Sequence, residues 1–251
     1  MRLIARLDIK NQNLIKTINL EGLRVLGNPN KFAKKYYLDG ADELIFMDLV
    51  ASLYNRNNLH EIIKMISNFI FIPVTVGGGV RSINDALNLF NSGADKIAIN
   101  TGAIKSPELL NDLIKRFGSQ AIVLSIEAKK RDNDFWEVYT ESGRQETGVN
   151  VLDWVRKCDK IGVGEFLLTS IDNEGTGKGF DIDLANQVTK ATNIPIILSG
   201  GFGKVKDIID ASKVCDPDAV AFADALHYDK ISIKKIREEC LKANLEVRNL
   251  N

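Results

Sequence analysis

The sequence is poor in the residues that bind metals and cross-link chains. Among 251 residues there are only three cysteines and two histidines, and Cys158, Cys215 and Cys240 stand far apart with no CxxC pair. Zinc sites need clustered Cys or His ligands, so we expect no metal site. Disulfides are equally unexpected, and we interpret the three thiols as free in a reducing compartment.

The chain also lacks net charge and long apolar runs. Lysine plus arginine balances aspartate plus glutamate at 33 each, which argues against a nucleic-acid-binding or membrane-surface protein. No run approaches the roughly 18 apolar residues of a membrane span, and the charged N-terminus is unlike a signal peptide. We therefore expect a cytoplasmic protein whose partners bind at local sites.

Eight short apolar runs rich in Ile, Val, Leu and Phe alternate with amphipathic segments. The runs are typical of buried parallel strands, and several of the segments open on Asn, Ser or Asp, as helices do. The predicted strands are 3–9, 43–50, 72–78, 96–100, 121–128, 165–171, 194–201 and 219–226, and the predicted helices lie in 28–41, 58–69, 82–94, 106–118, 150–162, 181–192, 204–214 and 232–245. Eight such units fit either a closed barrel or a doubly wound open sheet.

An internal repeat decides between these two folds. The segment that starts at Ala41 aligns with the one at Val163, and the segment at Ile72 aligns with the one at Ile194, both at an offset of 122 residues. Two four-strand halves that close on each other predict one α/β domain over residues 1–251, a (β/α)8 TIM barrel with internal two-fold symmetry. The first and fifth strands then end on opposite sides of the barrel mouth.

Two carboxylates stand near the ends of these two opposite strands. Asp8 lies in the first apolar run and Glu127 in the fifth, and each is followed two residues later by a lysine, Lys10 or Lys129. A charge in a buried strand is unfavourable unless it is used, and paired carboxylates serve general acid–base catalysis. We predict that Asp8 and Glu127 are the catalytic pair, although each could instead form an ion pair at the barrel rim.

Glycine-rich turns follow the third and seventh predicted strands, at positions related by the repeat. Bare backbone N–H groups in such turns bind phosphate, although a single turn of this kind is also typical of an ordinary tight connection. Two related turns predict a ligand that carries a phosphate at each end. The turns and the polar residues near them comprise Gly78, Gly79, Asn100, Thr101, Asp172, Gly175, Thr176, Gly200, Gly201 and Gly203.

Charged residues precede four of the strands at the other end of the predicted barrel. They are Arg2, Glu43, Lys96 and Glu165. Charges there usually form a solvated rim or stabilising ion pairs. Their alternating signs also fit a ring around the barrel axis, but these residues alone assign it no function.

The segments "RLIARLDIK", "VTVGGGVRS", "GADKIAINT" and "GEFLLTSIDNEGTGKGFD" resemble, in order and spacing, the cyclase subunit of imidazole glycerol phosphate synthase. The resemblance runs from Arg2 to about Val247. It implies a lyase of histidine biosynthesis that receives ammonia from a partner glutaminase and needs no metal or organic cofactor. Its substrate would be a bis-phosphorylated ribulosyl-aminoimidazole ribonucleotide, converted to imidazole glycerol phosphate and aminoimidazole carboxamide ribonucleotide.

The resemblance also assigns roles to residues. The family's two catalytic aspartates match the carboxylate pair, and its lysines in and after the first strand match Lys10 and Lys16. Its phosphate-binding residues match the glycine-rich turns. The ring of four charges matches its ammonia gate, and Asp95 and Gln120 match positions that face the glutaminase. The glutaminase is therefore expected to form a heterodimer with the N-terminal face of the barrel.

Three departures from the family pattern keep other functions open. Glu127 replaces the family's second aspartate, the usual loop after the first strand is replaced over residues 10–29, and Asp224 stands where the family has a small residue. Such changes resemble barrel paralogues that supply ammonia for the amidation of a surface sugar. The alternatives are therefore such a paralogue in glycan biosynthesis, or a non-catalytic phosphate-binding barrel that activates a glutaminase.

Overall fold

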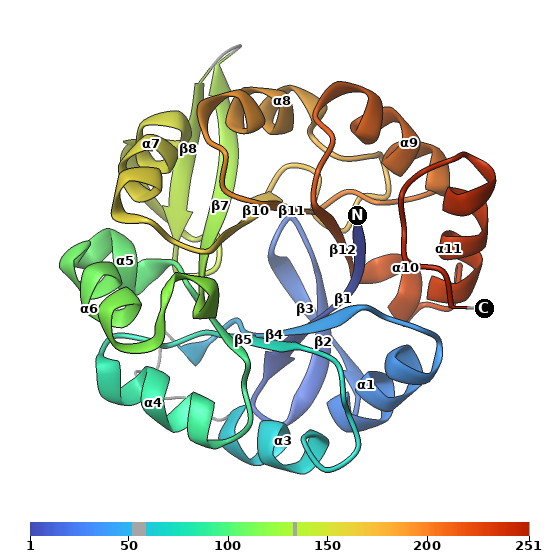
Figure 1. Cartoon of the computed structure of the whole chain (residues 1–251), viewed down its shortest axis with the longest axis horizontal. Helices are drawn as coiled ribbons and strands as arrows, with labels where there is room; N and C mark the ends of the chain where they lie inside the picture. Colours follow the sequence, from blue (N-terminus) through green and yellow to red (C-terminus); the bar gives the residue numbers. More distant parts are fainter. Residues whose placement is uncertain (52–58, 133–134, 251) are drawn as a thin grey trace.

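Within residues 1–51, 59–132 and 135–250, which the computed structural model describes, eight parallel strands close into a ring (Figure 1). In ring order the strands are β1 (Arg2–Lys10), β4 (Glu43–Asp48), β5 (Val74–Gly77), β6 (Lys96–Ile99), β7 (Ile122–Asp132), β10 (Glu165–Ser170), β11 (Ile196–Ser199) and β12 (Ala219–Phe222). β12 pairs back onto β1, which closes the barrel. The predicted (β/α)8 TIM barrel is confirmed.

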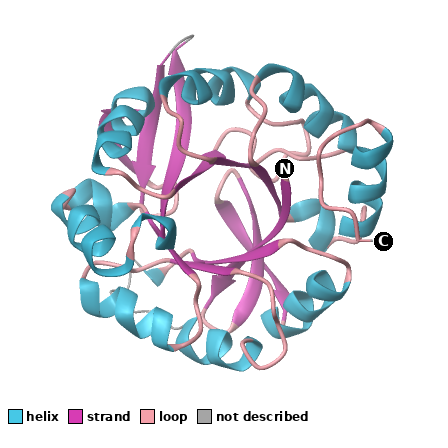
Figure 2. Cartoon of the chain, viewed as in Figure 1, coloured by secondary structure: helices cyan, strands magenta, loops and turns pink. Residues whose placement is uncertain are grey.

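The helices surround this ring on the outside (Figure 2). They are α1 (Pro29–Leu38), α3 (Leu59–Ile66), α4 (Ile83–Asn91), α5 (Thr101–Lys105), α6 (Glu108–Phe117), the 3₁₀ turn η1 (Ser119–Ala121), α7 (Val151–Ile161), α8 (Ile182–Ala191), α9 (Val205–Val214), α10 (Asp224–His227) and α11 (Ile233–Lys242). In the described part of the chain, none of these helices has the length and apolar character needed to cross a bilayer.

Side chains that alternate along each strand build two apolar layers. In β1, Leu3 packs outward in the layer between barrel and helices, whereas Ile4 faces inward into a separate cluster that fills the barrel. Because both faces of every strand are buried, the strands carry continuous apolar runs, which made them recognisable in the sequence.

Capping side chains set the start of several helices where the sequence predicts them. Asn28 accepts the backbone N–H of Asn30 at 2.9 Å, and Ser82 accepts that of Asp85 at 3.1 Å. Asn150, Asp181 and Ser232 cap α7, α8 and α11 in the same way. These hydrogen bonds satisfy N–H groups that have no partner within the helix.

The last predicted strand, 219–226, is wrong in its second half. The strand β12 ends at Phe222, and Asp224–His227 form the short helix α10. Ala225, Leu226 and His227 are nevertheless buried. A short apolar run does not reveal whether it is buried as strand or as helix, so the pattern extended the strand too far.

Two antiparallel hairpins extend the first and fifth barrel strands, at positions related by the two-fold repeat. β2 (Asn13–Ile18) and β3 (Glu21–Gly27) continue β1, and β8 (Phe135–Thr140) and β9 (Gln145–Asn150) continue β7. From the sequence, residues 10–29 are expected to form a loop, and no strand is expected over 135–150. The available signal for the second hairpin was the run of aromatic and β-branched residues in "FWEVYT", followed by the turn "ESGR".

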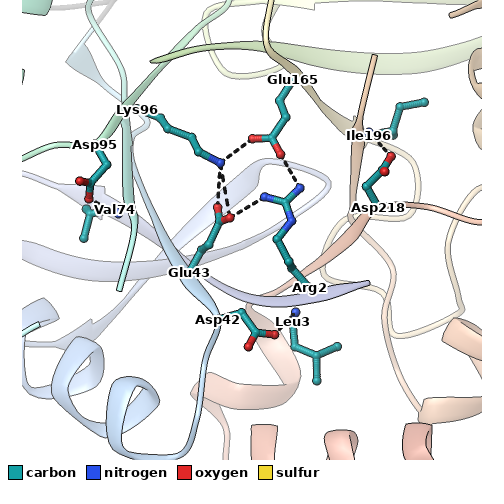
Figure 3. A network of polar contacts seen from close by, with 10 residues as sticks. All are labelled: Arg2, Leu3, Asp42, Glu43, Val74, Asp95, Lys96, Glu165, Ile196 and Asp218. Carbon is teal, nitrogen blue, oxygen red and sulfur yellow. Dashed lines mark hydrogen bonds and ion pairs between the residues drawn. The ribbon is translucent and has the colours of Figure 1, made fainter. Parts of the chain in front are cut away.

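Aspartates that precede three barrel strands bind the first residues of neighbouring strands (Figure 3). Asp42 accepts the N–H of Leu3 at 2.8 Å, Asp95 that of Val74 at 2.8 Å and Asp218 that of Ile196 at 2.9 Å. Asp42 also forms an ion pair with the buried Arg237 of α11, whose Nη2 lies 2.9 Å from its Oδ1. These carboxylates fix the register of the strands at the N-terminal end of the barrel.

We predict that Asp42→Ala destabilises the protein much more than Asp218→Ala. Asp42→Ala removes the carboxylate that pairs with the buried Arg237 guanidinium, which keeps only hydrogen bonds to backbone carbonyls, and should lower the free energy of unfolding by about 3 kcal/mol. Asp218→Ala removes one backbone hydrogen bond at an exposed position and should lower it by about 1 kcal/mol. Urea denaturation of both variants measures the difference, and equal losses would contradict the role given to the Arg237 pair.

Candidate active site

Asp8 and Glu127 lie on opposite strands of the ring, β1 and β7, as the repeat predicts. Asp8 is fully buried and Glu127 is 4% exposed. Each stands where its strand begins to pair with its hairpin, Asp8 opposite Ile15 and Glu127 opposite Tyr139. Both carboxylates therefore lie beneath the hairpins at the C-terminal end of the barrel, where enzymes of this fold place their chemistry.

The two oxygens of the Asp8 carboxylate have different surroundings. Its Oδ1 accepts a hydrogen bond from Nε of Arg6 at 2.9 Å. Its Oδ2 is buried and has no hydrogen-bond partner among the described residues. A buried carboxylate oxygen without a partner is unfavourable, and such groups in a native structure commonly serve function. Asp8 is thus held by one oxygen and can offer the other to a ligand.

Glu127 is a weaker acid than an ordinary glutamic acid. Burial raises the pKa of its carboxyl group from 4.5 to about 7, and Asp8 adds to this effect. The Arg6 guanidinium and a hydrogen bond from the N–H of Gly143, 2.8 Å from Oε2, act in the opposite direction. The group is therefore partly protonated near neutral pH, which suits it to donate a proton.

Arg6 belongs to this site, and the sequence analysis missed it. Its side chain is 2% exposed, and it donates to Asp8 and to hydroxyl groups on two other strands of the barrel. The available signal was a charged residue inside a buried strand, two positions before Asp8 and therefore on the same face.

The first predicted phosphate turn lines a cavity of about 230 Å³. Gly78, Gly79, Asn100 and Thr101 lie in its wall, together with Glu127. Gly78 has a φ of +108°, and a Cβ there would stand 2.5 Å from the backbone oxygen of Asp48, so this turn requires glycine. Arg81 and Lys105 add cationic side chains to the same wall.

The second predicted turn is more crowded and more acidic. Gly200 and Gly201 border a gap of only about 10 Å³, together with Glu174 and Asp224. Asp224 forms an ion pair with Lys230. A Cβ on Gly201 would collide with the carbonyl oxygen of Gly179, so close packing of two loops accounts for this glycine. The two turns, although related by the repeat, therefore differ in the space and the charged side chains around them.

A larger cavity of about 640 Å³ lies beside this second turn. Its wall contains Lys16 and Arg24 from the β2–β3 hairpin, Gly175 from the loop after β10, and Asp224 and Lys230 from the region of α10. Lys16 is buried and forms an ion pair with the buried Glu174. The lysine predicted in a loop after the first strand is therefore held within a hairpin.

The β2–β3 hairpin is anchored across the mouth of the barrel. The N–H of Asn19, in its turn, donates to the carbonyl oxygen of Glu174 at 2.8 Å, and its side chain reaches the carbonyl of Asp172. Leu20 in the same turn is fully buried against Tyr139 and Ile171. The hairpin thus shields the carboxylate pair from solvent.

Several other predicted ligand residues make local contacts. Asp172 is exposed and accepts the N–H of Lys130 at 2.8 Å. Thr176 donates from its hydroxyl to the carbonyl of Asn173 at 2.7 Å, and the N–H of Gly203 donates to Asp207 at 2.9 Å. Lys10 is half-buried at the end of β1. Ligand roles for these four residues stay predictions.

The four charges at the N-terminal end of the barrel form a closed ring (Figure 3). Arg2 pairs with Glu43 at 2.5 Å and also with Glu165. Lys96 pairs with Glu165 at 2.8 Å and with Glu43 at 3.2 Å. Each cation bridges both acids, so the ring is neutral and self-contained. It spans strands that the sequence separates by up to 163 positions.

The two predicted interface residues lie exposed near this end. Asp95 directly precedes β6, and Gln120 lies in η1 just before β7. Their strands begin beside the ring of charges, because Lys96 is the first residue of β6. The placement is compatible with a partner bound to this face.

Comparison with known proteins assigns the chain to a family. A sequence model of the family described as "Histidine biosynthesis protein" matches residues 2–232. A curated relative, imidazole glycerol phosphate synthase subunit HisF of Legionella pneumophila, is 60% identical over 207 residues, which cover 82% of this chain and 98% of that protein. The chain belongs to the HisF family.

Two further HisF subunits align over nearly the whole length of this HisF-family chain. The protein of Lactococcus lactis subsp. lactis is 42% identical over 248 residues, 98% of this chain and 96% of its own. That of Streptococcus mutans is 38% identical over 247 residues, 98% of each. The resemblance inferred from the motifs is confirmed.

We predict that Glu127→Gln makes the stability of this HisF-family barrel less dependent on pH. Between pH 4.5 and about 7 the folded protein retains a proton on Glu127 that the unfolded chain loses, so the wild type loses stability as pH rises through this window. At about 1.4 kcal/mol per pKa unit, the loss between pH 5 and pH 8 is about 2.5 kcal/mol. Urea denaturation at both pH values measures it.

The exposed Glu238 of α11 provides a matched control for this measurement. Glu238→Gln should leave the pH dependence of the wild type unchanged. If Glu127→Gln also leaves it unchanged, the carboxyl group of Glu127 does not carry the raised pKa.

Proposed function

We propose that this chain is the cyclase subunit of an imidazole glycerol phosphate synthase. In this function it uses ammonia from a partner glutaminase to convert a bis-phosphorylated ribulosyl-aminoimidazole ribonucleotide to imidazole glycerol phosphate and aminoimidazole carboxamide ribonucleotide. The observation that carries the proposal is the shared cavity, which joins Glu127 to the phosphate turn of Gly78 and Gly79. When one phosphate of such a ligand binds this turn, the reacting atoms next to it lie beside the carboxyl group of Glu127.

The two carboxyl groups divide the acid and base work. Ammonia first adds to the ribulosyl carbonyl carbon. Glu127, with a pKa of about 7, then donates a proton to the oxygen on that carbon, which leaves as water. Asp8, held by Arg6 and with one oxygen unpartnered, accepts the proton released when the nucleotide is eliminated and the imidazole ring closes. Two carboxyl groups in different environments commonly take such opposite roles.

Ammonia reaches these groups through the barrel in the proposed mechanism. Above the ring of charges, the interior is lined by apolar side chains, among them Ile4, Ile45, Val123 and Leu167. Neutral ammonia can pass such a lining more readily than ammonium, because an unpaired charge is costly to desolvate. Lys96 or Arg2 would need to leave its partners for the ring to open.

The glutaminase docks on the N-terminal face in this proposal. Asp95 and Gln120 are exposed there beside the ring, and a stable complex would bury on the order of 1,200–2,000 Å². Docking at this end places the source of ammonia at the entrance to the barrel.

A second function is favoured by the ion pairs beside the second turn. Glu174 and Asp224 border Gly200 and Gly201, and they already pair with Lys16 and Lys230. A second phosphate would have to compete with these carboxylates for the two lysines. This observation supports a paralogue that delivers ammonia for the amidation of a surface sugar. Under that function, the complex would release ammonia from glutamine yet fail to convert the bis-phosphorylated ribonucleotide.

We predict that Asp8→Asn abolishes conversion of the ribonucleotide when ammonium salt supplies the nitrogen. The amide cannot accept the proton, so kcat should fall by at least about 1,000-fold. Substrate binding, measured by calorimetry, should change by less than about threefold, since the phosphate turn is untouched. Asp112→Asn on the exposed surface of α6 is the control. Unchanged turnover in Asp8→Asn would remove this residue from the mechanism.

We predict that Lys96→Ala uncouples glutamine from the cyclase reaction. Removing one cation breaks two of the pairs that close the ring, so activity driven by glutamine in the complex should fall about tenfold. Turnover with ammonium salt should remain, because the carboxylate pair is at the other end of the barrel. Lys190→Ala on the exposed surface of α8 is the control, and equal losses in both assays would instead show that the ring only stabilises the fold.

A further inference from the structure

The side chain of Arg6 in β1 crosses part of the barrel interior, past the neighbouring strand β12, to reach β10 and β11. Its Nη1 donates to Oγ1 of Thr169 in β10 at 2.9 Å and to Oγ of Ser199 in β11 at 3.1 Å. The strand β12 lies between β1 and β11 in the ring. Its inward side chains are the small Ala219 and Ala221, which leave room for the long arginine side chain to pass.

These contacts, together with the hydrogen bond to Asp8, hold two nitrogens of the Arg6 guanidinium, Nε and Nη1. Its Nε holds Oδ1 of Asp8, while the two hydroxyl groups hold Nη1. A guanidinium is planar and rigid, so fixing one nitrogen on two strands also fixes the direction in which the other nitrogen points. The orientation of the Asp8 carboxylate therefore depends on hydroxyl groups that it does not itself contact.

A requirement for stability alone does not account for this arrangement. Burying an arginine and an aspartate is costly, and apolar side chains of similar volume are often at least as stabilising. Furthermore, Oδ2 of Asp8 is left buried without a hydrogen-bond partner. A pair built only for stability would satisfy both oxygens, whereas this one leaves an acceptor for a ligand.

We propose that Arg6, anchored on Thr169 and Ser199, is a positioning residue that holds Asp8 by Oδ1 so that Oδ2 is presented to the substrate. The role in turnover rests on the proposed function, in which Asp8 is the base. In this role Arg6 does not touch the reacting atoms and acts by orienting the Asp8 carboxylate, apart from its electrostatic effect on Glu127.

The test removes the anchors and leaves Arg6 in place. Replacing Arg6 itself would leave Asp8, Glu127 and Glu174 without a shared counter-charge, and the barrel could fail to fold. The double substitution Thr169→Val with Ser199→Ala keeps the charges and nearly the same volume. Thr75→Val is the matched control, because the buried Thr75 hydroxyl in β5 has no hydrogen-bond partner among the described residues.

Two measurements are made on the full-length protein. Crystal structures of the wild type and of both variants give the Asp8 and Arg6 side-chain conformations, which should rotate or become multiple only in the double variant. Turnover with ammonium salt should then show kcat lowered about 10- to 100-fold and KM changed less than about twofold, because a misplaced catalytic group loses mainly transition-state stabilisation.

The outcomes separate the inference from the proposed function. An unchanged Asp8 conformation in the double variant overturns the inference, even if kcat falls, because the loss would then arise from Thr169 or Ser199 directly. A reoriented Asp8 with unchanged kcat also overturns it. If the wild type does not convert the ribonucleotide, the proposed function fails, and the crystal structures still decide whether the anchors position Asp8.

Discussion

Backbone pairing between β1 and β12 closes the sheet into a ring, and the candidate site depends on that closure. The register sets Arg2 opposite Ala219 and Ala5 opposite Phe222, so the first strand of the chain becomes the neighbour of the last. Only then can Arg2 reach Glu165, and only then does Arg6 reach Thr169 and Ser199. In an open sheet with the same strands, these side chains would have no common interior to share.

The closed barrel encloses charged side chains at two levels, and the two levels differ in charge balance. At the N-terminal end, Arg2 and Lys96 balance Glu43 and Glu165, so the ring needs no other partner. The four ion pairs hold the starts of β1, β4, β6 and β10 together at this end of the barrel.

Near the mouth the balance of charge is incomplete, and this suits catalysis. Arg6 and Lys16 face Asp8, Glu174 and Glu127, three acids to two cations. Burial makes a third negative charge unfavourable, so Glu127 retains its proton until about pH 7. The buried carboxyl group can therefore donate a proton near neutral pH, but its ionisation at higher pH lowers the free energy of unfolding.

The sequence by itself determined the barrel, its two-fold repeat and the strands on which Asp8, Glu127 and the four ring charges lie. It could do so because continuous apolar runs and a 122-residue repeat are local or periodic features of the order of residues. Only the tertiary structure decided that Arg6 holds Asp8, that Lys16 pairs with Glu174, that hairpins cover the mouth and that the two related glycine turns have different surroundings. Each of these depends on burial and on partners from distant strands, which no spacing along the chain encodes.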